Sequence, residues 1–316
     1  MSLLRNGIDL YDRLTAFCSA SEELIIFAPY VKLDPLKRLL ESVPHCRSVL
    51  VRWEPRDLLT GVSDLEVYEF CLTKGVALYR NPRLHLKAFV DSYRSAIIGS
   101  ANISSRALNL PESKTFNYEL ATLIENLSIE DRLYFSLIID ESQLITDSIY
   151  QQIKQSMEGK SIVLPEADFD LTFDMPDTSF LISSLPLSYD VPTFLDVCST
   201  GTAADETAIN CAMHDAALYK LDISKPAADL REDLKFAFFT HPFISAFLAN
   251  LAIDGFVFFG AAKDWIQKNC TNVPIPRKWE ITENVQILYR WIVDLGEEKY
   301  SVDVPGTHSE RLHIVR

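Results

Sequence analysis

The chain has 316 residues, 48% of them hydrophobic, which is enough for two domains with substantial cores. No apolar stretch reaches the length of a membrane span, and the first six residues lack the pattern of a signal peptide, so we expect no membrane partner. The six cysteines form no C-x-x-C pair and lie mostly in apolar runs, which favours a reduced, cytoplasmic protein without a cysteine zinc site.

The formal net charge of −14 is concentrated in one segment. Residues 165–233 hold 14 acidic and 3 basic residues, whereas residues 1–164 and 234–316 are close to balance. From Lys74 to Arg106, by contrast, six basic residues accompany one acid, Asp91. A locally basic region on an acidic protein can still attract a phosphate ligand.

Helices and strands alternate in the first half of the chain. The spacing of apolar residues predicts helices over 7–20, from 34 onward and over 63–72, a short helix over 104–108, and a mostly helical stretch over 129–157. Apolar runs predict strands over 23–28, 46–53, 76–79 and 118–124. This order predicts an α/β fold in which helices flank a mixed sheet.

A β-hairpin is predicted between these elements. Its first strand carries His85, Lys87 and Asp91 on one face, residues 92–94 make the turn, and residues 95–98 form an apolar return strand.

The hairpin brings the sequence Gly99-Ser100-Ala101-Asn102 opposite His85 and Lys87. An imidazole, an ammonium, a hydroxyl and a carboxamide then surround one point. These groups suit an anionic, tetrahedral ligand, because lysine supplies charge, serine and asparagine supply hydrogen bonds, and histidine serves as nucleophile or general acid.

This pattern resembles the signature of the phospholipase D superfamily, the HKD phosphodiesterases: His-x-Lys, four residues, Asp, then Gly-Ser-x-Asn. The matching residues are His85, Lys87, Asp91, Gly99, Ser100 and Asn102, and Glu119 matches a glutamate on the following strand. A core histidine beside a surface lysine would explain two of these residues but not the whole pattern. The resemblance covers about residues 7–160, one half of the family's usual paired architecture.

The resemblance implies a site composed of His85, Lys87, Ser100, Asn102 and Glu119, with no metal and no cofactor. In that family, phosphodiester cleavage proceeds through a covalent phosphohistidine. Lys87, Ser100 and Asn102 would hold the non-bridging oxygens, and Glu119 would orient or tune an imidazole. Asp91 is expected to brace the hairpin. Because two histidines are required and the chain has one His-x-Lys motif, we expect a homodimer with a shared site.

Three regions are predicted: a phospholipase D-like catalytic domain (1–160), an acidic linker region (161–233) with a helical patch near 206–221, and a smaller C-terminal α+β domain (234–316). The last region shows the order of a winged helix: a helix, a short strand, two helices and a hairpin. Its helix over 283–295 has one cation, Arg290, which favours packing against a core or a protein partner. The cations better placed for phosphate contact lie at the terminal hairpin: Lys299, His308, Arg311, His313 and Arg316.

The motif leaves the substrate open among DNA, RNA and lipid. A single motif joined to a winged-helix candidate resembles bacterial single-motif nucleases, so DNA is the favoured substrate. The alternatives are a phospholipase or phosphatidyl transferase, and a non-catalytic subunit of a nucleic-acid defence or repair complex that binds a protein through its C-terminal domain. The acidic segment is either a solvated spacer or a tether that competes with phosphate for the basic site.

Overall fold

The chain forms two compact units, residues 1–169 and 170–316, which we call the N-terminal unit and the C-terminal unit. The computed structural model describes residues 3–160, 180–203, 205–271, 274–305 and 309–315. The two units have separate hydrophobic cores.

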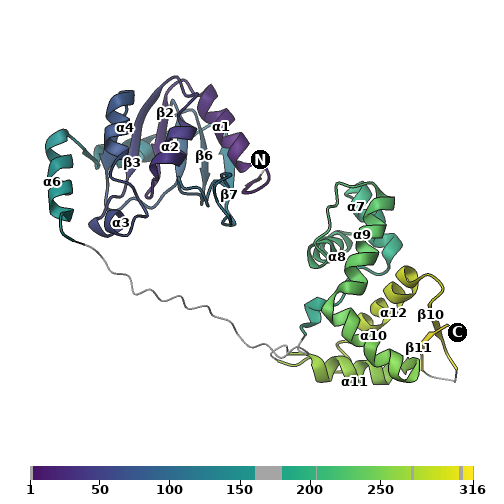
Figure 1. Ribbon diagram of the computed structural model, residues 1–316. Helices are drawn as coiled ribbons and strands as arrows, with labels where there is room; N and C mark the ends of the chain where they lie inside the picture. The colour runs from purple at the N-terminus through teal and green to yellow at the C-terminus, as the bar shows by residue number, and fades with distance from the viewer. Residues whose placement is uncertain (1–2, 161–179, 204, 272–273, 306–308, 316) are drawn as a thin grey trace. The chain divides into compact units, whose positions relative to one another are not determined.

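An eight-stranded mixed sheet forms the centre of the N-terminal unit (Figure 1). Its strand order is β1-β7-β6-β5-β2-β3-β4-β8; the β2–β3 and β3–β4 pairs are parallel and the other pairs are antiparallel. The elements are β1 (Leu3–Arg5), α1 (Leu10–Ala20), β2 (Leu24–Phe27), α2 (Leu33–Leu39), β3 (Cys46–Val51), α3 (Pro55–Leu59), α4 (Val67–Lys74), β4 (Ala77–Arg80), β5 (Ala88–Asp91), β6 (Ser95–Gly99), β7 (Leu120–Ile124), α5 (Ile129–Asp140), β8 (Gln143–Leu144) and α6 (Asp147–Met157).

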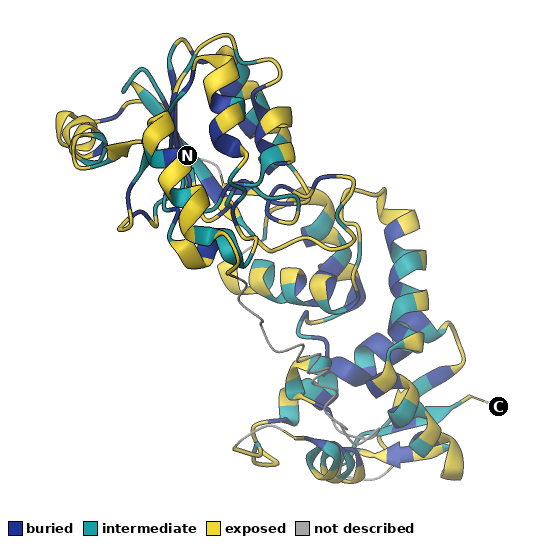
Figure 2. Cartoon of the chain, turned by 60° about the vertical axis from the view of Figure 1, so that its left-hand side comes forward, coloured by how far each residue is buried: buried dark blue, intermediate teal, exposed yellow. Residues whose placement is uncertain are grey.

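Helices cover both faces of this sheet. Apolar side chains of α1, α2 and α4 pack on one face, where Figure 1 shows these helices, and α5 covers the other face through Phe135, whose ring lies 5.2 Å from that of Phe27. Because β5 lies in the middle of the sheet, Ala88, Phe89 and Val90 are all buried. In Figure 2 the helices show exposed residues on their outer sides and buried residues toward the sheet.

The predicted α/β class with a mixed sheet flanked by helices is confirmed in the N-terminal unit. Three details differ from the prediction. His85 and Lys87 precede β5 instead of belonging to it, residues 104–108 form turns instead of a helix, and the two-residue strand β8 separates α5 from α6.

The C-terminal unit combines helices with a small three-stranded sheet of order β10-β11-β9. Its elements are a 3₁₀ turn (Ile182–Ser184), α7 (Val191–Thr200), α8 (Glu206–Leu218), α9 (Ala227–Thr240), α10 (Pro242–Asp254), β9 (Phe256–Phe258), α11 (Phe259–Asn269), α12 (Thr282–Gly296), β10 (Tyr300–Asp303) and β11 (Arg311–Ile314). The order from α10 to β11 is the one predicted for a winged helix, and that assignment stays a prediction.

Residues 180–233 differ from the predicted acidic linker, because they fold as part of the C-terminal unit. Val191 and Phe194 of α7 are buried in its core. The acidic residues have structural roles here: Asp190 and Asp205 cap α7 and α8, and buried Asp215 accepts backbone N–H groups of residues 187 and 188 at 2.8 and 2.7 Å. The competing-tether hypothesis was made for residues 165–233, and its part over 165–179 lies outside the described residues.

Helix α12 packs against the core, as its sequence favoured. Seven of its residues are buried, and Trp291 Nε1 donates to the Ser188 carbonyl at 2.9 Å. Of the hairpin cations predicted for phosphate contact, Arg311 forms a bidentate pair with Asp303, at 2.9 and 2.6 Å, and His308 and Arg316 lie outside the described residues.

Within the described residues, no single helix is long and apolar enough to cross a membrane. Taken together, α9 and α10, which are bent by 65° at their junction, have the length and composition of a membrane span, and nothing beyond length and composition points to one.

Candidate active site

The predicted site residues gather at one edge of the eight-stranded sheet. The carboxyl ends of β2, β3, β4 and β6 meet there with the amino ends of β5 and β7, and we call this the site edge. The residues that lie at it are within three positions of the start of β5 or β7 or of the end of β6: His85, Lys87, Ser100, Asn102 and Glu119. The sheet therefore brings together groups that lie up to 34 positions apart in the chain.

A cavity of about 880 Å³, which we call the first cavity, opens at the site edge. Four of the five predicted residues line it: His85, Lys87, Ser100 and Asn102. Much of its remaining wall is apolar, formed by Leu3, Leu86, Ile98, Leu120, Tyr134 and Phe135. The first cavity thus combines polar and cationic groups with apolar side chains.

Glu119 belongs to the site through Ser100. The Ser100 hydroxyl donates to Glu119 Oε2, and Asn117 Nδ2 donates to Oε1 at 3.3 Å. Glu119 is not among the residues that line the first cavity, and its carboxylate accepts hydrogen bonds from Ser100 and Asn117. The predicted role of Glu119 in orienting an imidazole stays a prediction.

Gly99 allows β6 and β7 to approach closely beside the site. A Cβ at this position would lie 2.5 Å from the Leu120 carbonyl oxygen and 2.6 Å from the Ala121 Cβ. The close approach lets Ser100 N donate to Leu120 O at 3.0 Å and Leu120 N donate to Ser100 Oγ at 3.1 Å. Backbone contact therefore fixes Ser100, and the Gly-Ser pair of the motif has a steric reason.

Lys87 is a partly buried cation at the rim of the first cavity. Its Nζ donates to the His85 carbonyl at 2.8 Å. Burial lowers the pKa of Lys87 below its usual 10.5; the negative charge of Glu119 opposes this change, and the positive charge of Arg52 adds to it. An anionic ligand would stabilise the charged form that burial disfavours.

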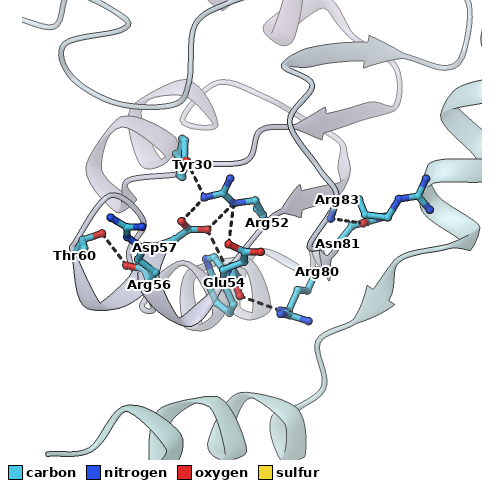
Figure 3. A network of polar contacts seen from close by, with 10 residues as sticks. Tyr30, Arg52, Glu54, Arg56, Asp57, Thr60, Arg80, Asn81 and Arg83 are labelled. Atoms are coloured by element: carbon cyan, nitrogen blue, oxygen red, sulfur yellow. Dashed lines mark hydrogen bonds and ion pairs between the residues drawn. The ribbon is translucent and has the colours of Figure 1, made fainter. Parts of the chain in front are cut away.

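Arg52, which the motif does not include, is a second cation near the site. It directly follows β3, donates through Nε to Asp57 Oδ2 at 2.9 Å, and donates through Nη2 to the Tyr30 hydroxyl at 2.8 Å (Figure 3). Asp57 is 3% exposed. The hydrogen bonds to Asp57 raise the pKa of Arg52, so this residue keeps its charge. The sequence shows that Arg52 follows an apolar strand. It does not show that this end of the strand lies at the same edge of the sheet as His85 and Lys87.

Two other residues lie where their roles are structural. Asp91 Oδ1 accepts the backbone N–H groups of Glu22 and Glu23 at 2.9 and 3.2 Å, so it braces the hairpin against the start of β2 as expected. His45 directly precedes β3 and lies at the opposite edge of the sheet from the site. Among residues 3–160, His85 is therefore the histidine at the site edge.

No family model matches the chain, and no curated protein matches it. Solved structures with a similar fold include Nuc, a phospholipase D family member from Salmonella typhimurium, at 13% identity and a TM-score of 0.37; the match covers 46% of this chain and 99% of Nuc. NucT from Helicobacter pylori has 17% identity and a TM-score of 0.34, with 46% and 98% covered.

Phosphatidylserine synthase from Haemophilus influenzae Rd KW20 is a third such structure, at 14% identity and a TM-score of 0.35, with 50% of this chain and 44% of the synthase covered. The superfamily that the motif resembles is thus represented among structures similar in fold. At this identity and TM-score the likeness says nothing of activity, so we infer the activity of this chain from its own residues.

Proposed function

We propose that the chain is a metal-independent phosphodiesterase that cleaves nucleic acid, with DNA as the favoured substrate, through a covalent phosphohistidine. The observation that carries the proposal is the convergence of His85, Lys87, Ser100 and Asn102 on one cavity. An imidazole nitrogen of His85 attacks phosphorus, a P–N bond forms, and the P–O bond to the leaving oxygen breaks. Lys87, Ser100 and Asn102 stabilise the non-bridging oxygens as negative charge develops on them.

The reaction needs a second group, which gives a proton to the leaving oxygen. The other histidine of the N-terminal unit, His45, is not placed to do this. His45 lies at the opposite edge of the sheet, so it cannot protonate the leaving oxygen. In a homodimer with the site on its two-fold axis, the second copy of His85 would donate that proton. The same imidazole would then deprotonate the water that hydrolyses the P–N bond.

A phospholipase or phosphatidyl transferase is the second candidate, and the apolar wall of the first cavity favours it. Leu3, Leu120 and Phe135 offer a surface that an acyl chain or a glycerol backbone would cover. A third candidate, a non-catalytic subunit that binds a protein through its C-terminal domain, predicts no turnover at all.

One assay separates the three candidates. Purified protein is incubated with plasmid DNA, single-stranded DNA, RNA and phosphatidylcholine, each in excess EDTA. We expect nucleic acid to be cut in EDTA by the wild type and by His45→Ala, and not by His85→Ala. Activity that EDTA abolishes and Mg²⁺ restores would refute the mechanism, and cleavage of phosphatidylcholine alone would establish the second candidate.

A further inference from the structure

A second cavity of about 620 Å³ adjoins the first. Asn102 lines both cavities, and its Oδ1 is buried without a hydrogen-bond partner among the described residues. Asn117 lines the second cavity and donates to Glu119 at 3.3 Å. A group bound to phosphorus in the first cavity would therefore reach the second by passing Asn102, which the two cavities share.

Tyr30 provides an aromatic wall of the second cavity. Its backbone is tied to the segment that carries Asn102, because Ile103 N donates to Tyr30 O at 3.2 Å and Lys32 N donates to Ile103 O at 2.9 Å. The Arg52 guanidinium carbon lies 4.8 Å from the centre of the Tyr30 ring, and Nη2 donates to its hydroxyl at 2.8 Å (Figure 3). Since Asp57 holds Arg52 through two hydrogen bonds, the ring is fixed before any ligand arrives.

The other polar groups of the second cavity do not form a second phosphate site. Lys32 is paired with Asp64, and Glu112 accepts from the Ser105 hydroxyl at 2.9 Å and pairs with Arg38 at 3.2 Å. Arg106 is exposed at the rim, and its guanidinium has no hydrogen bond or ion pair with the described residues. An aromatic wall with mixed donors and acceptors, and one free cation at the rim, suits a nucleoside followed by another phosphate.

We propose that the second cavity is a nucleoside subsite in which a nucleobase attached to the scissile phosphate stacks on Tyr30, while Arg106 contacts the next phosphate of the strand. This inference rests on the proposed function and deepens it, because it selects nucleic acid over lipid. The volume of the second cavity lies in the range that is typical of small-molecule sites, roughly 300–1,000 Å³.

Equilibrium binding tests the subsite without requiring turnover. The full chain is titrated by calorimetry with inorganic phosphate, thymidine 5′-monophosphate and glycerol 3-phosphate, in EDTA. Base stacking contributes roughly 1–3 kcal/mol, so we expect wild type to bind the nucleotide at least about fivefold more tightly than inorganic phosphate. In Tyr30→Ala, the two affinities should lie within about twofold of each other, with phosphate affinity unchanged.

Two further variants serve as matched controls. Tyr30→Phe keeps the ring and should keep the preference for the nucleotide, and Tyr134→Ala removes a ring that lines the first cavity and should also keep it. If Tyr30→Ala is unfolded by circular dichroism, Tyr30→Leu replaces it, because leucine fills the space without a stacking surface.

Three outcomes overturn the inference: a preference that survives Tyr30→Ala or Tyr30→Leu, a preference lost in Tyr134→Ala, or glycerol 3-phosphate bound more tightly than the nucleotide. The proposed function is tested separately by cleavage. A chain that cuts DNA in EDTA without any Tyr30-dependent nucleotide preference has the proposed function but lacks the subsite.

Discussion

The C-terminal unit and the site edge of the N-terminal unit use their basic side chains differently. In the C-terminal unit, Arg311 pairs with Asp303, Arg231 donates to the Asp294 carbonyl at 2.8 Å, and Lys225 pairs with Asp233 at 2.6 Å. At the site edge, Lys87 donates only to a backbone carbonyl and lies near a second cation, Arg52. Arg52 is itself paired with Asp57, whereas Lys87 has no ion pair among the described residues, so Lys87 is the cation of the first cavity that favours an anionic ligand.

The acidic side chains show the same contrast. Asp190 and Asp205 of the C-terminal unit cap helices, and Asp215 is fully buried against backbone N–H groups. Glu119 at the site edge is partly exposed and is hydrogen-bonded to Ser100 and Asn117. These three aspartates of the acidic segment thus have local structural roles in the C-terminal unit.

Among the predictions that test this contrast, the largest effect should come from Lys87→Ala, which removes a cation that lines the first cavity. We expect kcat for DNA cleavage to fall about 10²–10³-fold, the cost of one preorganised group that stabilises transition-state charge. The matched variant Lys225→Ala breaks an exposed ion pair of the C-terminal unit and should leave kcat unchanged. Steady-state kinetics in EDTA measure both. Equal losses in the two variants would refute the contrast between the units.

Gly99→Ala should reduce activity by a smaller amount. The new Cβ requires β6 and β7 to separate, which displaces Ser100, and displacement of a site group by about 1 Å can cost up to about 10²-fold. Gly75, which ends α4 with a φ of +70° and has open space around its Cβ position, is the matched control. Gly75→Ala should lower the melting temperature while leaving kcat unchanged. If Gly99→Ala retains full activity, the close approach has no role in placing Ser100.

Much of the N-terminal fold follows from local pattern. The apolar runs of β2, β3 and β4 predict buried strands, and a glycine in the left-handed region ends α4 as expected. His85 and Lys87 were predicted within a strand because their side chains alternate with apolar ones. In the structure, β5 pairs with β2 only from Ala88 onward, so the preceding residues are free to form the site edge. Strand pairing, which is not local, decides this boundary.

The motif residues of the site were predictable, and their surroundings were not. The spacing from His85 to Asn102 carries its own signal because a short hairpin joins the two parts. Arg52 and Tyr30 reach the site only through the order β5-β2-β3, which no short stretch of sequence encodes. The helix over residues 191–200 was missed for a different reason. Pro186 and Pro192 favoured a linker, although Pro192 lies in the first turn of α7, where proline is accepted, and burial against α12 stabilises that helix.

Subunit mixing tests whether the N-terminal unit is complete by itself. When wild type and His85→Ala are mixed in equal amounts and exchange fully, about a quarter of the dimers carry two intact copies of His85. A shared site predicts total activity of about one quarter of the same total amount of wild type, whereas self-sufficient subunits predict about one half. Exchange is verified with two differently tagged chains. A monomeric mass for the active protein would also exclude the shared site.

The smallest effect concerns the alkaline limb of the pH–rate profile. Because burial lowers the pKa of Lys87, its charge is lost below pH 10.5, and kcat should fall at a lower pH than an ordinary lysine would give. Arg52→Gln removes a like charge, so it should raise the pKa of Lys87 and move the limb to higher pH, while Arg52→Lys should not.

A change in stability does not explain this loss of rate. Between the pKa of Lys87 in the folded protein and 10.5, the unfolded chain binds more protons at Lys87, so this group makes folding more favourable as pH rises. Loss of rate in that window would therefore not reflect unfolding caused by Lys87, and a melting curve at each pH checks this directly. An identical limb in wild type and in folded Arg52→Gln would show that Arg52 does not act on Lys87.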